Sequence, residues 1–169
     1  MFWGRKTKPP NIDILADEKH ANALGKFAVD ATRAGNLAMV DANSLALSRV
    51  ASGIPSIPLE MGPTELPQEC GLEEDAIDFD KGCYLGQEVM ARIHAMGQVQ
   101  RVLLPATIKK ESPERIPAEL FLGEKKAGEL KSYFSHESDI FGSGMALVRR
   151  NLLPEIRATR LSFLPSDKP

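Results

Sequence analysis

The chain has 169 residues, of which 43% are apolar and 26% charged, and its formal net charge at pH 7 is -2. This length and apolar content allow one hydrophobic core or two small ones. The near-zero net charge gives no general attraction to nucleic acid or to a membrane surface, and we expect neither as a direct partner. No stretch approaches the about 20 apolar residues of a membrane span, and residues 1–10 lack the apolar core of a signal peptide, so we expect a cytoplasmic protein.

Two cysteines, Cys70 and Cys83, lie apart in the sequence, without a C-x-x-C pair or clustered histidines. This spacing argues against a zinc site and against a disulfide framework. We therefore expect no metal site, a structural role for Cys70, and at least one thiol that is available for function.

The first half of the chain predicts two amphipathic helices. Residues 18–34 carry apolar side chains at helical spacing, with Asp17 placed to cap the start and Gly35 to end the helix. A second helix is predicted after Asp41, another N-cap residue, and Arg49 lies in its last turn.

A short peptide motif follows an irregular stretch. Residues 53–67 contain four prolines and two glycines, a density that predicts an ordered loop. Residues 76–79 then alternate as a short strand does, and the octapeptide Lys-Gly-Cys-Tyr-Leu-Gly-Gln-Glu follows at 81–88. Apolar residues recur at helical spacing from Val89, so we predict a strand, a glycine-flanked turn that carries the motif, and a helix.

The sequence pattern of the last third of the chain is typical of a small β-domain. Short β-type runs bounded by glycine, proline or charged residues are predicted to form strands at 99–108, 118–122, 126–134, 140–148 and 157–164. Five antiparallel strands favour a small barrel or sandwich, and we place the domain boundary near Met96-Gly97.

Cys83 is the candidate for a reactive thiol. A cysteine just ahead of a helix lies near unpaired backbone N–H groups and the positive end of the helix dipole, both of which favour a thiolate, and Lys81 adds to this. Gly82 and Gly86 allow close approach of a ligand, while Tyr84 offers a ring face and a phenol. The alternative is a purely structural turn in which Cys83 is a small buried residue.

Three other polar residues have two interpretations each. Arg49 could grip a carboxylate or phosphate, or serve only the end of its helix. Glu88 in the first turn after the motif is explained by the helix dipole alone. His94 lies downstream of the motif without a visible orienting partner, which favours a solvated histidine at a helix end over a catalytic base.

The octapeptide, followed by Ala91-Arg92, resembles the signature of the YgfZ family, which is folate-binding, related to the glycine-cleavage T-protein, and active in iron–sulfur cluster assembly and repair. Residues 49–55 and 66–79 fall in the order that the family shows. The resemblance implies an α+β fold: a partial T-protein-like folate-binding α/β unit in residues 1–96, and a small antiparallel β-barrel in residues 97–169.

The function that the resemblance implies is that of a tetrahydrofolate-linked accessory factor for the assembly or repair of iron–sulfur clusters, including those of tRNA-modifying enzymes. In that family the cysteine of the motif is the required residue, with its lysine and tyrosine close behind, which maps to Cys83, Lys81 and Tyr84 without assigning a reaction. The implied contacts with the cofactor, tetrahydrofolate or a derivative, are made by Arg49, Gly86, Gln87 and Glu88.

Members of the family normally begin with a long α/β stretch, and this sequence resembles one that starts inside it, with about the front half absent. Exposed strand edges and apolar faces then predict a homodimer or dependence on a partner, such as an iron–sulfur client. Two alternatives stay open: an aminomethyltransferase-like one-carbon transferase, for which Asp78 and Asp80 flank the motif but are explained as turn residues, and a truncated interaction module that does not bind folate. Whether the chain is an enzyme is left open.

Overall fold

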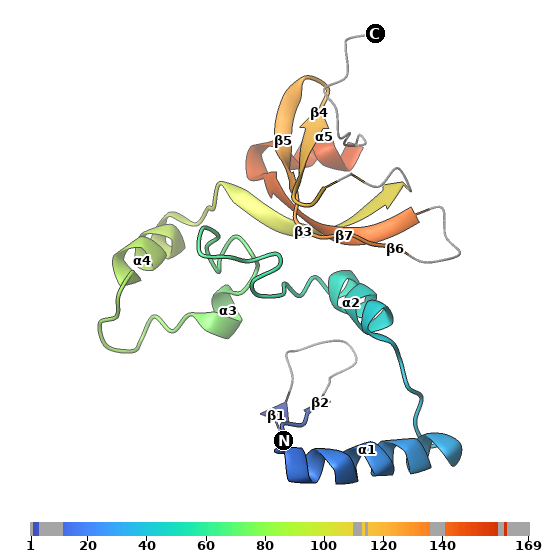
Figure 1. Ribbon diagram of the computed structural model, residues 1–169. Helices are drawn as coiled ribbons and strands as arrows, with labels where there is room; N and C mark the ends of the chain where they lie inside the picture. The colour runs from blue at the N-terminus through green and yellow to red at the C-terminus, as the bar shows by residue number, and fades with distance from the viewer. Residues whose placement is uncertain are drawn as a thin grey trace. The chain divides into compact units, whose positions relative to one another are not determined.

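The computed structural model describes residues 2–3, 12–109, 113, 115–135, 141–158 and 161 (Figure 1). The chain forms two compact units, Met1–Ile54 and Pro55–Pro169. The predicted domain boundary at Met96-Gly97 falls inside the second unit and stays a prediction. Within the described ranges, no helix has both the length and the apolar character needed to cross a membrane.

The first unit confirms both predicted helices. Its elements are β1 (Phe2–Trp3), which pairs antiparallel with β2 (Ile12–Asp13), then α1 (Glu18–Arg33) and α2 (Ala42–Ala51). The carboxylate of Asp17 accepts a hydrogen bond from the N–H of His20 at 2.9 Å, and that of Asp41 accepts one from Ser44 at 2.6 Å. Each N-cap therefore satisfies a backbone donor that the helix itself leaves unpaired.

The second unit begins with an irregular segment, residues 55–72, and continues into α3 (Glu73–Ala76) and α4 (Gln87–Met96). The loop and the helix after the motif are as predicted. The strand predicted at 76–79 is wrong. Ala76 is the last residue of α3, and the N–H of Ile77 donates to the carbonyl oxygen of Glu73 at 3.2 Å, so the helix end takes up the start of that stretch. Asp78 then accepts hydrogen bonds from the N–H groups of Asp80 at 2.9 Å and Lys81 at 3.1 Å, which form a turn.

The rest of the second unit is an antiparallel sheet. Its strands are β3 (Arg101–Lys109), β4 (Ala118–Leu122), β5 (Lys125–Leu130), β6 (Phe134–Ser135) and β7 (Phe141–Arg149). The order is β3-β7-β5-β4, with β6 also paired to β7. The core cluster consists of Ile108, Leu120, Leu130, Ala146 and Val148.

The antiparallel sheet is as predicted, but the described strands form an open sheet and not a barrel, since β3 and β4 end the path. The strand predicted at 126–134 is interrupted after Leu130. The strand predicted at 157–164 is wrong at its start, because 157–158 belong to α5 (Leu153–Ala158), and 159–160 and 162–164 lie outside the described residues. Pro154 favours the first turn of a helix, and Leu153 and Ile156 pack against the core cluster.

Candidate functional site

The motif lies on the loop that leaves α3 and enters α4 (Figure 1). Gly86 has φ +87°, a left-handed conformation that glycine adopts without steric cost, and it stands at the N-cap position of α4. The N–H of Gln87 donates to the carbonyl oxygen of Tyr84 at 3.2 Å, which closes the turn. The predicted glycine-flanked turn before a helix is therefore confirmed, although a short helix and a turn precede it in place of a strand.

The two cysteines have opposite environments. Cys83 is exposed, which excludes its interpretation as a small buried residue, whereas Cys70 is 3% exposed. Burial, with the negative charges of Glu69 and Glu65, raises the pKa of Cys70 to about 11. Cys70 therefore stays a protonated thiol at neutral pH, and Cys83 is the accessible one.

Lys81 and Tyr84, the other two residues of the predicted functional motif, contact each other. The Nζ atom of Lys81 lies 4.6 Å from the centroid of the Tyr84 ring, a cation–π arrangement. The hydroxyl oxygen of Tyr84 is buried and, among the described residues, has no hydrogen-bond partner. The contact between Lys81 and the Tyr84 ring thus joins the chain before Cys83 to the chain after it.

The residues predicted to bind folate lie in both units. Gln87 and Glu88 occupy the first turn of α4, where Glu88 accepts from Arg92 at 2.9 Å in an exposed ion pair. In α2 of the first unit, the Nη1 atom of Arg49 donates to the carbonyl oxygen of Ile54 at 2.6 Å. This bond supports the helix-end interpretation of Arg49, while its contact with folate stays a prediction.

His94 has partners that the sequence did not reveal. Its Nδ1 atom lies 2.7 Å from Oε1 of Glu73 in α3, and its ring stacks on that of Phe79 with a centroid distance of 4.1 Å and an interplanar angle of 27°. The expectation of a histidine without an orienting partner is therefore wrong. Both partners are distant in sequence, so local spacing carried no signal for them.

Sequence reasoning also missed a group of buried glutamates in the irregular segment. Glu60, Glu65 and Glu69 are 0%, 8% and 4% exposed. Each accepts a hydrogen bond from a backbone N–H three or four residues earlier, at Ser56, Gly62 and Leu66 respectively. Buried loop N–H groups need acceptors. Three glutamates in a proline-rich loop were therefore the sequence signal for carboxylates that bind the loop's own backbone.

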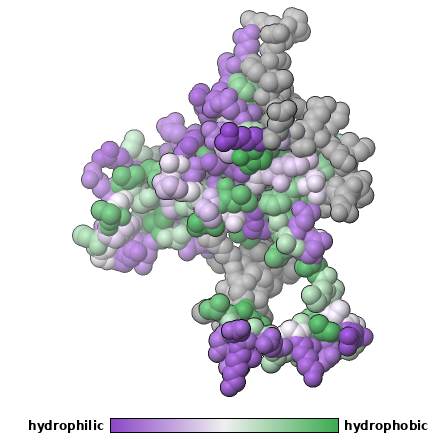
Figure 2. Space-filling view, in the orientation of Figure 1, coloured by the Kyte–Doolittle hydropathy of each residue, from purple (hydrophilic) through white to green (hydrophobic). Residues whose placement is uncertain are grey.

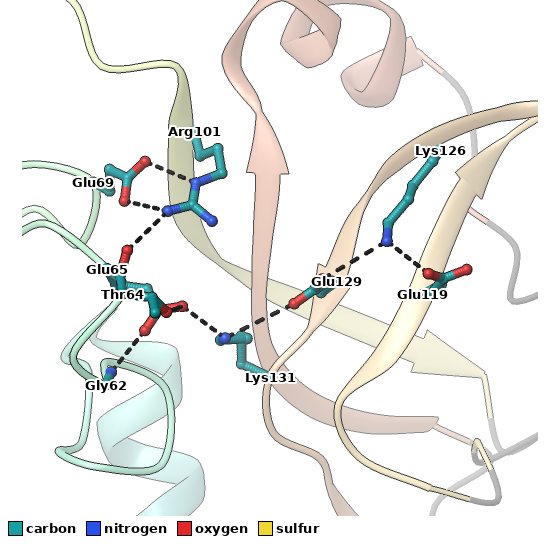
Figure 3. Close-up of polar contacts among 9 residues, drawn as sticks. All are labelled: Gly62, Thr64, Glu65, Glu69, Arg101, Glu119, Lys126, Glu129 and Lys131. Carbon is teal, nitrogen blue, oxygen red and sulfur yellow. Dashed lines mark hydrogen bonds and ion pairs between the residues drawn. The ribbon is translucent and has the colours of Figure 1, made fainter.

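Two of these carboxylates attach the loop to the sheet (Figure 3). Arg101 of β3 grips Glu69 through Nε and Nη2, at 2.8 and 2.9 Å. Lys131, just after β5, binds Oε1 of Glu65 at 2.9 Å.

Burial by itself raises the pKa of Glu65, but the hydrogen bonds from Lys131, the Gly62 N–H and Thr64 outweigh it and hold that pKa below its ordinary value.

A groove of about 260 Å³ lies beside α4, and its lining includes Leu66, Glu69, Arg92, Ile93 and Met96. This volume is below the range of about 300–1,000 Å³ that is common for small-molecule sites. The residues predicted to bind folate do not line it. The groove is therefore not the site that the predicted folate contacts would form.

The described residues thus form an α+β chain that presents the exposed thiol of Cys83 on a glycine-flanked turn before α4. No protein-family model matches the chain. The chain is 37% identical over 146 residues to a protein of Coccidioides immitis named iron–sulfur cluster assembly factor IBA57 homolog, mitochondrial. The alignment covers 72% of this chain and 34% of that protein.

Bacterial relatives carry a second name, tRNA-modifying protein YgfZ. The protein of Vibrio vulnificus is 37% identical over 108 residues, which cover 60% of this chain and 33% of the relative. That of Colwellia psychrerythraea is 32% identical over 93 residues, covering 52% and 29%. The chain belongs to the family of YgfZ and IBA57 proteins, and it spans about a third of the length of these relatives.

Proposed function

We propose that the chain acts in the assembly or repair of iron–sulfur clusters, including those of tRNA-modifying enzymes, and that this role depends on Cys83. The observation that carries the proposal is the exposed thiol of Cys83 on an ordered turn before α4. The names of the fungal and bacterial relatives support the class of function. A cytoplasmic location stays a prediction, since the fungal relative is named as mitochondrial.

The chemistry proposed for the turn is that of a soft sulfur ligand or nucleophile. A thiolate binds iron and iron–sulfur clusters, and an exposed cysteine flanked by Gly82 and Gly86 admits a bulky partner. Asp78, considered as a carboxylate that could steer a one-carbon transfer, instead accepts hydrogen bonds from two backbone N–H groups of its own turn. This favours the accessory role over the transferase.

Replacement of Cys83 by alanine tests the proposal. In cells that lack the endogenous factor, Cys83→Ala is expected to reduce the recovered activity of an iron–sulfur enzyme to the level without the chain, because no other exposed thiol exists in the described residues. Its free energy of unfolding is expected to change by less than about 0.5 kcal/mol, as is usual for exposed sites.

The matched control is Cys70→Ala. Loss of this buried side chain is expected to cost about 1–2 kcal/mol of stability while enzyme recovery at permissive temperature persists. If Cys83→Ala supports recovery as well as the unchanged chain does, the proposed role of the turn is wrong.

Tetrahydrofolate or a derivative is the proposed ligand, with Arg49, Gly86, Gln87 and Glu88 as its contacts. The support is the resemblance to a folate-binding family and the suitability of an arginine for a carboxylate. A reduced folate would supply one-carbon chemistry when bound. No step of the proposed function runs through it.

Titration with tetrahydrofolate is expected to stabilise the chain by about 2.7 kcal/mol at a ligand concentration 100 times the dissociation constant. Arg49→Ala is expected to abolish this stabilisation, whereas Arg33→Ala, at the end of α1, is expected to retain it. An absent thermal shift at saturating ligand would favour an interaction module that does not bind folate.

We also propose that the chain forms a homodimer or binds an iron–sulfur client. Helix α1 buries none of its residues, and Leu24 and Phe27, three positions apart on one face of the helix, are 38% and 66% exposed. The space-filling view shows hydrophobic side chains beside hydrophilic ones along this helix (Figure 2). Such an exposed apolar face supports a partner. A single monomeric species in sedimentation velocity at micromolar concentration, without added client, would contradict the homodimer.

A further inference from the structure

We propose that His94 is a positioning residue for Cys83: by binding Glu73 and stacking on Phe79, it holds the loop of residues 77–86 in place. The inference deepens the proposed function, because it rests on Cys83 being the functional thiol. It concerns a residue that touches neither Cys83 nor any ligand in the described structure, so its effect on the thiol is indirect.

The path of the chain makes His94 a suitable anchor. The loop leaves α3 after Ala76 and enters α4 at Gln87 (Figure 1). His94 lies seven residues after Gln87, roughly 10 Å further along the helix axis. Because Phe79 is stacked on His94, the chain must return along α4 between residue 79 and the start of the helix. The motif occupies this returning stretch.

Two contacts fix the imidazole ring. Oε1 of the Glu73 carboxylate lies 2.7 Å from Nδ1 of His94, within hydrogen-bond distance. The ring of Phe79 lies 4.1 Å away, nearly parallel. The hydrogen bond sets the orientation of the imidazole plane, and the stack then sets the position of the loop.

Further bonds connect the anchored residue to the thiol. Asp78, next to Phe79, accepts hydrogen bonds from the N–H groups of Asp80 and Lys81. Lys81 lies over the ring of Tyr84, whose carbonyl oxygen accepts from Gln87. Cys83 thus lies between Lys81 and Tyr84, which contact each other. If Phe79 leaves His94, the loop loses its attachment on the N-terminal side of Cys83.

The rate of tryptic cleavage after Lys81 in the full native chain measures how firmly the loop of residues 77–86 is held. His94→Ala is expected to accelerate this cleavage about tenfold, which corresponds to about 1.4 kcal/mol in the free energy of local opening. Phe79→Leu is expected to do the same, whereas Phe79→Tyr, which keeps the ring, is expected to behave as the unchanged chain. Cleavage after Lys125, in β5, serves as the internal reference.

His20→Ala is the matched control. His20 forms a comparably exposed pair with Asp17, at 2.5 Å, on α1 of the first unit. It is expected to leave cleavage after Lys81 unchanged. Unchanged cleavage in His94→Ala would overturn the proposal, and so would equal acceleration after Lys125, because that result indicates general loosening.

The consequence for function is measured separately. His94→Ala is expected to lower recovery of an iron–sulfur enzyme several-fold, and the double variant with Cys83→Ala is expected to fall no lower than Cys83→Ala alone. Full recovery by His94→Ala with accelerated cleavage would overturn the link to Cys83. Full recovery by Cys83→Ala would instead contradict the proposed function, while the cleavage rates still report whether His94 holds the loop.

Discussion

Gly144→Ala is expected to lower the thermal midpoint of the second unit by about 10 °C, which corresponds to roughly 3 kcal/mol for a unit of this size. Gly144 lies in β7, which pairs with β3 along one edge and with β5 and β6 along the other. A Cβ atom at this position would meet the carbonyl oxygen of Ser132 at 1.9 Å. That oxygen belongs to buried main chain, so no side-chain rotation relieves the overlap.

Gly142→Ala and Gly25→Ala are the comparisons. At Gly142 the added atom would meet the side-chain ring of Tyr133, so we expect a smaller loss that Tyr133→Leu partly restores. At Gly25, in the middle of α1, nothing lies within 4 Å, and alanine is expected to stabilise the helix by about 0.5–1 kcal/mol. A midpoint for Gly144→Ala within about 2 °C of the unchanged chain would contradict the described approach of β7 to Ser132.

Lys131→Met is expected to cost about 3 kcal/mol, because it leaves the carboxylate of Glu65 buried without its cation. The side chains of Lys131 and Glu65 are 15% and 4% exposed, so solvent does little to replace the lost partner. Chemical denaturation at pH 7 measures this loss. Lys126→Met is the control: Lys126 pairs with Glu119 at the surface, and its loss is expected to leave the midpoint unchanged (Figure 3).

The cost of Lys131→Met is also expected to depend on pH. The pKa of Glu65 is lower in the folded chain than in the unfolded one, where it is roughly 4.3. Its contribution to stability is therefore fully present above that unfolded value and is lost as pH falls through the lower folded value. The difference between the two chains should be large at pH 6 to 7 and shrink toward pH 3. A difference that is constant over this range contradicts the assignment.

The local signals of the sequence predicted much of the fold. Asp17 and Asp41 are short acceptors ahead of helical patterns, and both cap the helices expected of them. The strands at β3, β4 and β7 follow their β-type runs closely. These elements depend on contacts within a few residues or on a simple alternation, which the sequence displays directly.

Long-range contacts were not predictable in this way. The strand expected at 76–79 is a separate, local error, because Ala76 ends α3 and the N–H of Ile77 donates to Glu73. Among the described strands the sheet stays open, and α5, which begins at Leu153 and packs against the core cluster, takes the first two positions of the last expected strand. The partners of His94 and the cations of Glu65 and Glu69 are all brought together by the fold alone.

At the candidate site, the sequence predicted the turn but left open whether Cys83 is an available thiol or a buried residue, and it did not reveal what holds the turn. Cys83, Lys81 and Tyr84 were identified as a group, and the structure adds that the last two contact each other. The contact of Arg49 with folate stays a prediction.

The most direct test of the central claim uses extracts of cells that lack the endogenous factor. Recovery of a tRNA-modifying iron–sulfur enzyme is measured after addition of the purified chain or of its Cys83→Ala variant, with folding of both verified by thermal unfolding. We predict that the unchanged chain restores the enzyme and that the equally stable variant does not. Equal recovery with both proteins would contradict the account.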